Sequence, residues 1–357
     1  MKTAIRLFAS MVCAALVLSS CSTVGYYYQA IDGQLDLMRR AVSFEEVIAE
    51  RGPDDALSRK LARVRSIRDY ASRELALPDN RSYRRYADLG RPYVVWNVFA
   101  APEFSVRSTE SCFPIAGCVA YRGFYAEADA RAYASDLAAK GLDTFFGGVP
   151  AYSTLGWFDD PVLSTFVNYP EVELARILFH ELAHQVVYVR DDTQFNESFA
   201  VAVEQEGVRR WLASQNGAGA GDAIRRWSAG RARQAEFLTM AIRHRGILAE
   251  IYASASSDTE KRLAKARQFQ RMMSDYAVLK KSWDGYAGYD RFFMQGPNNA
   301  LLASLAAYSD FVPGFTMLIL KHGGDMKAFY GEVGAMSRKD RAARAETLRT
   351  LAGTPSL

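Results

Sequence analysis

The pentapeptide His-Glu-Leu-Ala-His, at residues 180–184, constrains the fold of this chain more than any other feature of the sequence. Residues four apart on a helix lie on one face, about one turn apart. His180 and His184 can therefore direct both imidazole rings at a single metal ion, with Glu181 about 100° further round the helix. Two histidines do not complete the coordination of a metal. The fold must therefore bring a third ligand to this helix from elsewhere in the chain.

Zinc is the metal that this pattern indicates. In a catalytic site, zinc takes three protein ligands, commonly imidazole nitrogens, and one water molecule. Glu181 would lie next to that water and could accept its proton as a general base. The flanking residues are apolar, and placing His180, Glu181 and His184 among them costs desolvation energy unless a partner such as a metal satisfies them. The alternative is a structural cluster without a metal.

Glu197, thirteen positions after His184, is the best candidate for the third ligand. This spacing allows the first helix to end, a loop to turn and a second helix to return beside it, with Glu197 in its first turn. Glu204 lies two turns further on, on nearly the same face. It is either a rival ligand or a carboxylate that orients a histidine, and Asn196 is a second candidate for such an orienting role.

The first twenty-one residues have the composition of an export signal. Two basic residues precede an apolar run that ends at Leu18 and is short for a membrane span. The following Ser19-Ser20-Cys21 resembles the bacterial lipobox, so we expect residues 1–20 to be a lipoprotein signal peptide and residues 21–31 a tether lipidated at Cys21. The serine at position 22 is typical of sorting to the outer membrane, on its periplasmic side. The alternatives are a plain signal peptide and an N-terminal membrane anchor.

The remaining composition agrees with an exported globular protein. Outside the signal and Cys21, the only cysteines are Cys112 and Cys118, which a tight turn could bring together as a disulfide in an oxidising compartment. The net charge is +4 and the basic residues are scattered, so the sequence gives no support for binding nucleic acid. Through the lipid, the expected partner is a membrane.

The periodicity of apolar residues predicts an α+β fold that is mainly α. Residues 32–213 would form a core with N-terminal helices, and the flexible stretch 214–222 would lead into a helical part, residues 214–357, of the same unit. Two strands are expected at 92–104 and 117–125. The expected helices lie at 32–76 (as a hairpin), 126–141, 170–189, 196–213, 219–256, 258–281 and 288–308, with a loop or short hairpin at 147–163.

The segments "HELAHQ" and "NESFAVAVE" resemble the gluzincin metallopeptidases, in particular the alanyl-aminopeptidase type. The resemblance implies that His180, His184 and Glu197 bind zinc, that Glu181 is the base, and that a small sheet packs on the zinc helix. The connecting loop is about six residues shorter than in that type. The G-A-M-E-N segment, which there binds the free amine of the substrate, is missing. Nearly the whole mature chain is also similar to a family of bacterial lipoproteins described as aminopeptidases.

This resemblance implies a zinc-dependent peptidase, most simply an aminopeptidase, with a peptide or protein as its substrate. The alternatives are an endopeptidase of the cell envelope and a non-catalytic lipoprotein that keeps a structural zinc. Residues 117–125 could be an edge strand that pairs with peptide, or an interior strand. The candidates for stabilising the oxyanion are Tyr286, Tyr289 and Tyr308. The carboxylates that could hold a substrate amine are Glu103, Glu110, Asp159 and Asp160.

Overall fold

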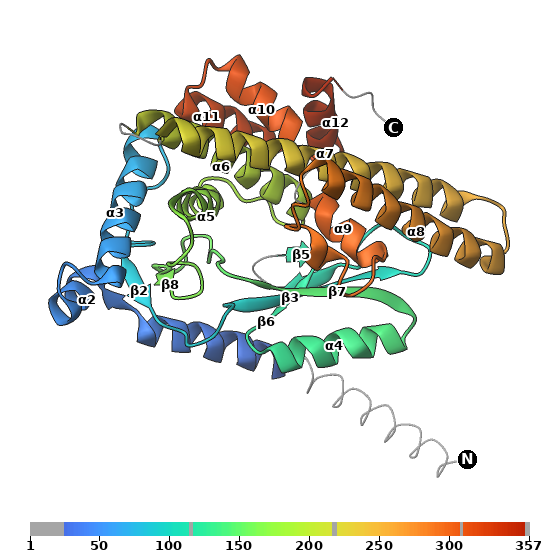
Figure 1. Cartoon of the computed structure of the whole chain (residues 1–357), viewed down its shortest axis with the longest axis horizontal. Coiled ribbons are helices and arrows are strands. Elements are labelled where there is room, and N and C mark those ends of the chain that lie inside the picture. Colours follow the sequence, from blue (N-terminus) through green and yellow to red (C-terminus); the bar gives the residue numbers. More distant parts are fainter. Residues whose placement is uncertain (1–24, 114–116, 216–219, 308–309, 354–357) are drawn as a thin grey trace, which may run out of the picture.

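The computed structural model describes residues 25–113, 117–215, 220–307 and 310–353 (Figure 1). The expected signal peptide and Cys21 lie outside these residues. Within them, none of the helices combines the length and the apolar character that crossing a membrane requires. The fold is α+β and mainly helical, with small sheets, as the sequence predicts.

The N-terminal helices form one wall of the main core. Residues 25–40 are helical and are followed by β1 (Val42–Ser43), α2 (Phe44–Arg51) and α3 (Ala56–Glu74). Ser43 closes a capping box at the start of α2, and the side chain of Asp55 caps α3. Helix α3 packs against α5, and four of its apolar residues recur three and four apart and are fully buried: Leu61, Val64, Ile67 and Ala71.

The largest sheet has the order β6-β3-β7 and is antiparallel throughout. Its strands are β3 (Val95–Pro102), β6 (Arg122–Phe124) and β7 (Leu142–Val149), and α4 (Glu127–Ala139) and α9 (Asn299–Ala307) pack against it. In Figure 1, α4 lies below the sheet and α9 above it. A second small sheet joins β1, β2 (Arg85–Ala87) and β8 (Val162–Leu163).

Strand β7 is absent from the expectation drawn from the sequence. Its sequence, Leu-Asp-Thr-Phe-Phe-Gly-Gly-Val, contains two glycines, which are typical of loops. The structure explains Gly148, because a Cβ atom there would lie 2.2 Å from the ring of Tyr93. The glycine therefore lets an aromatic ring cover the strand closely, and the expected loop at 147–163 begins only after Val149.

The C-terminal part is helical, with more interruptions than expected. The long helices α7 (Ala220–Ala253) and α8 (Asp258–Ser282) pack on each other and bury a small core of their own. The single helix expected at 288–308 is instead a short 3₁₀ turn (Asp290–Phe292) followed by α9, since Gly296 and Pro297 separate them. The chain continues through α10 (Val312–Lys321), α11 (Met326–Met336) and α12 (Arg341–Leu351).

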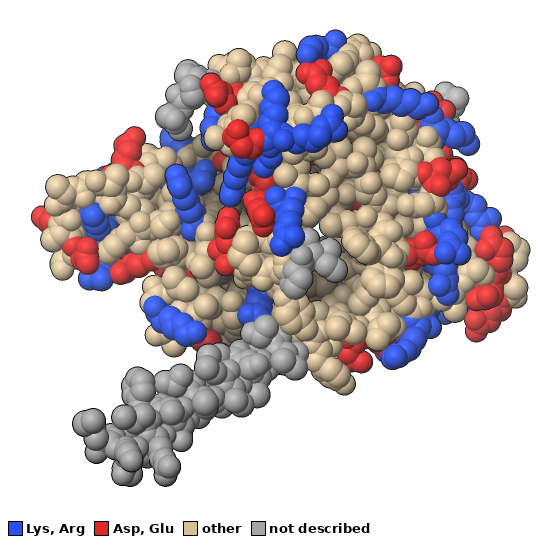
Figure 2. Space-filling model, turned by 180° about the vertical axis from the view of Figure 1, so that it is seen from behind, with Lys and Arg blue, Asp and Glu red and all other residues tan. Residues whose placement is uncertain are grey.

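The main core draws on both ends of the chain, from Leu37 to Leu348. At its centre lie α5 (Glu171–Ala183) and α6 (Thr193–Ser214), which pack closely on each other. Helix α5 also packs on α3, so its main neighbours are helices and not the small sheet that we expected. On the face shown in Figure 2, positive and negative side chains lie in mixed groups.

Candidate metal centre

Helix α5 ends earlier and α6 begins earlier than the sequence suggests. Pro170 precedes the first turn of α5, and His184 lies at the C-cap, immediately after Ala183. The expected end near Val189 is therefore wrong. The side chain of Asp192 accepts a hydrogen bond from the N–H of Phe195 and starts α6 at Thr193, so Glu197 lies beyond the first turn.

Three side chains of α5 and α6 converge on one point. The Nε2 atoms of His180 and His184 are 3.2 Å apart, and the Oε2 atom of Glu197 lies 3.4 Å from the first and 3.8 Å from the second. His184 and Glu197 are buried, and only 12% of the His180 side chain is exposed. The potential ligand atoms all lie within 4.8 Å of one another, so the cluster could hold a metal ion.

Glu181 lies in the same buried environment. Its side chain is 9% exposed. Burial raises the pKa of Glu181 to about 7, although the neighbouring His180 lowers it and Glu197 raises it further. A carboxyl group with this pKa can accept and release a proton near neutral pH.

Glu204 is on the other side of His180. Its Oε2 atom accepts a hydrogen bond from the Nδ1–H of His180 at 3.0 Å and another from Arg176 at 3.3 Å. Because Nδ1 is held in this way, Nε2 is left to face Glu197 and His184. Glu204 is therefore placed to orient His180, whereas Glu197 is placed to be the third ligand.

Asn196 has a different role from the one we expected. Its side-chain amide donates to the carbonyl of Val189 at 2.7 Å and accepts from the N–H of the same residue at 2.8 Å. These two bonds tie the start of α6 to the loop that follows His184. Asn196 thus fixes the path of the α5–α6 loop and does not orient a ligand directly.

A disulfide-bonded hairpin supports the same loop. Strands β4 (Ser111–Phe113) and β5 (Gly117–Val119) pair with each other, and Cys112 is bonded to Cys118. The N–H of Cys118 donates to Asp191, and the N–H of Ala120 donates to Thr193. Gly117 has a φ of +75°, and a Cβ atom there would collide with Asp191. The hairpin is therefore docked on the loop that joins the two helices of the cluster.

The strand expected at 117–125 is two short strands in different sheets. Strand β5 pairs with β4, and β6 is one edge of the β6-β3-β7 sheet. Within the segment 117–125, residues 122–124 are therefore the part that occupies an edge of the larger sheet. Tyr121 lies between the two strands and packs on Phe99, with a ring-centroid separation of 5.4 Å.

Two of the three tyrosines singled out from the sequence are described in the structure, and neither belongs to the ligand cluster. Tyr289 stacks on Phe237, and Tyr286 and Tyr289 line a cavity on the far side of Glu204. Tyr308 lies outside the described residues. Burial, followed by the charge of Glu197, raises the pKa of Tyr121 well above its usual value and that of Tyr188 to about 12.

Tyr121 and Tyr188 are therefore within electrostatic range of the site. They were not among the predicted residues, because the resemblance to gluzincins directed attention to tyrosines of later helices. Tyr188 stands only four residues after His184, and Tyr121 belongs to the segment already assigned to a strand.

Only one of the four candidate amine-binding carboxylates is associated with the cluster. Glu103 pairs with Arg262, Glu110 with Arg341, and Asp159 with Arg81, each at least partly exposed. Asp160 is buried and accepts hydrogen bonds from the backbone N–H and the hydroxyl of Thr154, at 2.9 and 2.8 Å. Burial raises its pKa to about 6, and its charge in turn contributes to the raised pKa of Glu181.

Comparison with known proteins assigns the chain to one family. The family described as "Putative aminopeptidase" matches residues 25–348. The match spans most of the chain, and this protein belongs to that family. No curated protein and no solved structure matches the chain.

Proposed function

We propose that the chain is a zinc-dependent aminopeptidase with a gluzincin-type centre. The observation that carries this proposal is the spacing of three ligand atoms, Nε2 of His180, Nε2 of His184 and Oε2 of Glu197, at 3.2, 3.4 and 3.8 Å. A tetrahedral zinc ion with bonds near 2.0–2.1 Å separates its ligand atoms by about 3.3 Å. Membership of the aminopeptidase family supports the reaction.

The side chains of the site suit hydrolysis of a peptide bond. A bound zinc ion would supply Lewis acidity to the attacking water and to the scissile carbonyl. Glu181, whose pKa burial raises to about 7, accepts the proton of the attacking water and returns it to the leaving amine. Tyr121 and Tyr188, whose hydroxyls stay protonated near neutral pH, are our candidates for stabilising the developing oxyanion.

Asp160 is the group that we assign to the α-amine of the substrate. It is a buried carboxylate close enough to Glu181 to perturb its pKa, and the other three candidates are engaged with surface arginines. An anionic group at this point would favour peptides with a free N-terminus. An endopeptidase would have no need of it.

Substitution of the base tests the proposal. Glu181→Gln should retain zinc and lower kcat by at least ~10²-fold, the usual contribution of a positioned general base. Glu206→Gln is the control, because Glu206 lies on α6 but pairs with Arg209 and Arg210. Free peptides should be cleaved from the N-terminus and N-acetylated peptides should not. Full activity of Glu181→Gln, or cleavage of acetylated peptides at internal bonds, would contradict the proposal.

We also propose that the protein is an envelope lipoprotein anchored at Cys21 on the periplasmic side of the outer membrane. The support is the lipobox-like Leu18–Cys21 and the serine that follows it. Cys21→Ala should release the protein from the membrane fraction of bacterial cells and abolish incorporation of labelled fatty acid. Unchanged fractionation and labelling would show that the anchor is elsewhere.

A further inference from the structure

A large cavity lies behind the candidate metal centre. It has a volume of about 920 Å³ and is bounded by α5, α6, α7 and the segment around Tyr286–Arg291. Glu204 is part of its wall and accepts a hydrogen bond from the Nδ1–H of His180. The two nitrogens of an imidazole lie on opposite edges of the ring, and Nε2 faces the ligand cluster. The cavity is therefore separated from the metal position by His180 and Glu204.

The lining contains more positive than negative groups. It includes five arginines and three glutamates. The glutamates are all engaged: Glu171 pairs with Arg63 at 2.6 Å, and Glu173 and Glu204 both pair with Arg176, at 2.8 and 3.3 Å. Arg63 and Arg176 thus form ion pairs with all three glutamates of the lining.

The other three arginines of the lining are Arg226, Arg231 and Arg291. Within the described part of the chain, none of them forms an ion pair. Arg231 donates to Gln234 on its own helix and is partly buried. Burial lowers the pKa of Arg231, while the charge of Glu204 raises it. A partly buried guanidinium without a counterion favours binding an anion, because the anion restores the electrostatic partner that burial removed.

The charge of the lining and the chemistry of guanidinium groups favour a phosphate group over a single carboxylate. Five arginines against three glutamates leave an excess of two positive charges, which matches a phosphate dianion. Guanidinium groups bind phosphate oxygens through paired hydrogen bonds, and phosphate offers three oxygens to several donors at once. Trp227, Tyr286 and Tyr289 add aromatic surface to the same cavity, which suits an organic group attached to the phosphate.

We propose that this cavity binds the phosphate group of a small phosphorylated molecule or of a lipid headgroup, held by Arg226, Arg231 and Arg291. This site is distinct from the one that cleaves peptide, and its existence does not depend on the proposed function. The contact between Glu204 and His180 places the bound phosphate one side chain away from a candidate metal ligand.

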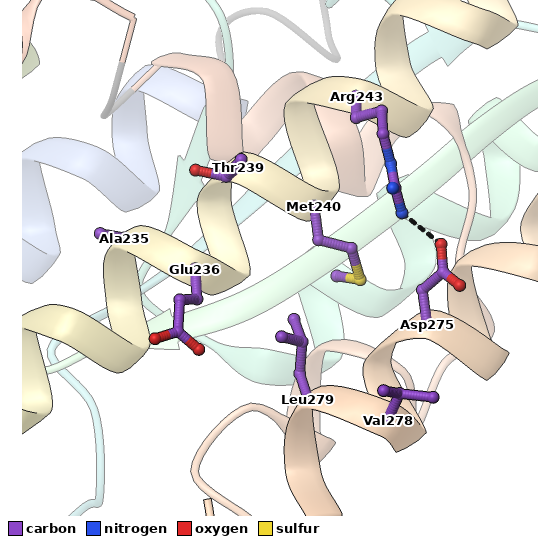
Figure 3. Close-up of a pocket in the computed structure, with 8 residues that line it drawn as sticks. All are labelled: Ala235, Glu236, Thr239, Met240, Arg243, Asp275, Val278 and Leu279. Atoms are coloured by element: carbon purple, nitrogen blue, oxygen red, sulfur yellow. Dashed lines mark hydrogen bonds and ion pairs between the residues drawn. The ribbon is translucent and has the colours of Figure 1, made fainter. Parts of the chain in front are cut away.

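The second cavity of the helical part provides a natural contrast. It has a volume of about 540 Å³ and lies between α7 and α8 (Figure 3). Its arginine, Arg243, is paired with Asp275, as the dashed line in Figure 3 shows. The charge of Arg243 is therefore neutralised by a carboxylate, and Arg243 is a matched control for the unpaired arginines.

Titration with inorganic phosphate tests the site directly. Calorimetry on the full, metal-loaded chain at constant ionic strength should detect binding, and Arg231→Gln and Arg291→Gln should each weaken it by at least ~10-fold, as loss of a charge-assisted bond predicts. Arg243→Gln should bind like the parent. His184→Ala, which removes a candidate metal ligand, should also retain phosphate, and this excludes phosphate bound to the metal itself. Failure of the proposed peptidase activity would leave these results unchanged.

Two glycines of α7 allow a second test, in which one substitution fills the cavity and the other is its matched control. A Cβ atom at Gly230 or at Gly246 would meet nothing within 4 Å, but only Gly230 lines the cavity. Gly230→Phe should abolish phosphate binding and Gly246→Phe should not, with both variants showing parental circular dichroism. Equal phosphate affinity of the parent, Arg231→Gln and Gly230→Phe would overturn the proposal, and so would the absence of binding at millimolar phosphate.

Vesicles distinguish the two sources of the phosphate group. The full chain is incubated with vesicles that contain phosphatidic acid, whose headgroup is a phosphate monoester, and with phosphatidylcholine vesicles, and its flotation is compared with that of Arg231→Gln and Arg243→Gln. Loss of the preference for phosphatidic acid in Arg231→Gln alone identifies a lipid headgroup as the ligand. Equal flotation of all three proteins, together with phosphate binding to the parent, identifies a free phosphorylated compound.

Discussion

Each nitrogen of the His180 ring faces a different carboxylate. Nε2 lies 3.4 Å from Glu197 and Nδ1 lies 3.0 Å from Glu204. Burial lowers the pKa of His180, but the hydrogen bonds with Glu197 and Glu204 outweigh burial and raise the pKa above its usual value. Burial lowers the pKa of His184. Without a metal, the positive charge of the cluster therefore resides on His180, between the two glutamates.

This charge distribution predicts how metal affinity depends on pH. The metal-free site carries a proton on His180 that a metal must displace, so low pH favours the metal-free form and affinity should rise with pH. One displaced proton corresponds to about a tenfold gain in metal affinity per pH unit, over roughly pH 6 to 8. Competition with a chelator measures the slope. Glu204→Gln should make the slope shallower. His322→Gln should not, because the ring of His322 contacts Glu332 in another part of the molecule. A flat profile would exclude a protonated His180.

Among the structural elements, the helices of the site were largely predictable and the strands around it were not. The periodicity of apolar residues identified α5 and α6, and the spacing of His184 and Glu197 was enough to predict that α6 returns beside α5. The boundary between them depends on the side chain of Asp192, which no periodic pattern reveals. Strand β7 was missed because the contact of Gly148 with Tyr93 is a tertiary feature.

The β4–β5 hairpin is the element whose removal should disturb the site most selectively. Replacing both Cys112 and Cys118 with serine should lower the free energy of unfolding by about 2 kcal/mol, the value for so short a disulfide loop. It should also weaken metal binding, because the hairpin donates hydrogen bonds to Asp191 and Thr193 on the path to Glu197. Urea denaturation and chelator competition measure the two effects. Ser111→Ala, in the same strand, is the control; if the double variant matched it in both measurements, the hairpin would have no supporting role.

At the scale of the whole molecule, the C-terminal helix stabilises the start of α6. Arg344 of α12 donates to Asp192 at 2.6 and 3.0 Å, and both side chains are buried. Asp192 in turn caps α6, the helix that carries Glu197. The two residues are 152 positions apart, so no local pattern in the sequence could predict this pair. The residues after 214 thus contribute directly to the geometry of the site.

Loss of this ion pair should destabilise the protein strongly. Arg344→Met leaves the buried carboxylate of Asp192 without its partner and should lower the free energy of unfolding by about 3 kcal/mol. Arg341 also approaches Asp192, but at 3.8 Å and with 57% of its side chain exposed, so Arg341→Met should cost less than about 1 kcal/mol. Adding Asp192→Asn to Arg344→Met should recover part of the loss. Equal effects of the two arginine substitutions in thermal unfolding would contradict this reading.

The zinc affinity of two glutamate variants tests the central claim most directly. Glu197 lies 3.4 and 3.8 Å from the two Nε2 atoms, whereas Glu204 contacts Nδ1 of His180 and Arg176. Removing a ligand should cut affinity far more steeply than removing an orienting carboxylate, which costs about 10 to 100-fold. In a competitive chelator titration, Glu197→Ala should therefore lose zinc at micromolar free metal while Glu204→Ala retains most of it. The reverse order would assign the metal to Glu204, and full retention by both variants would show that neither glutamate is a ligand.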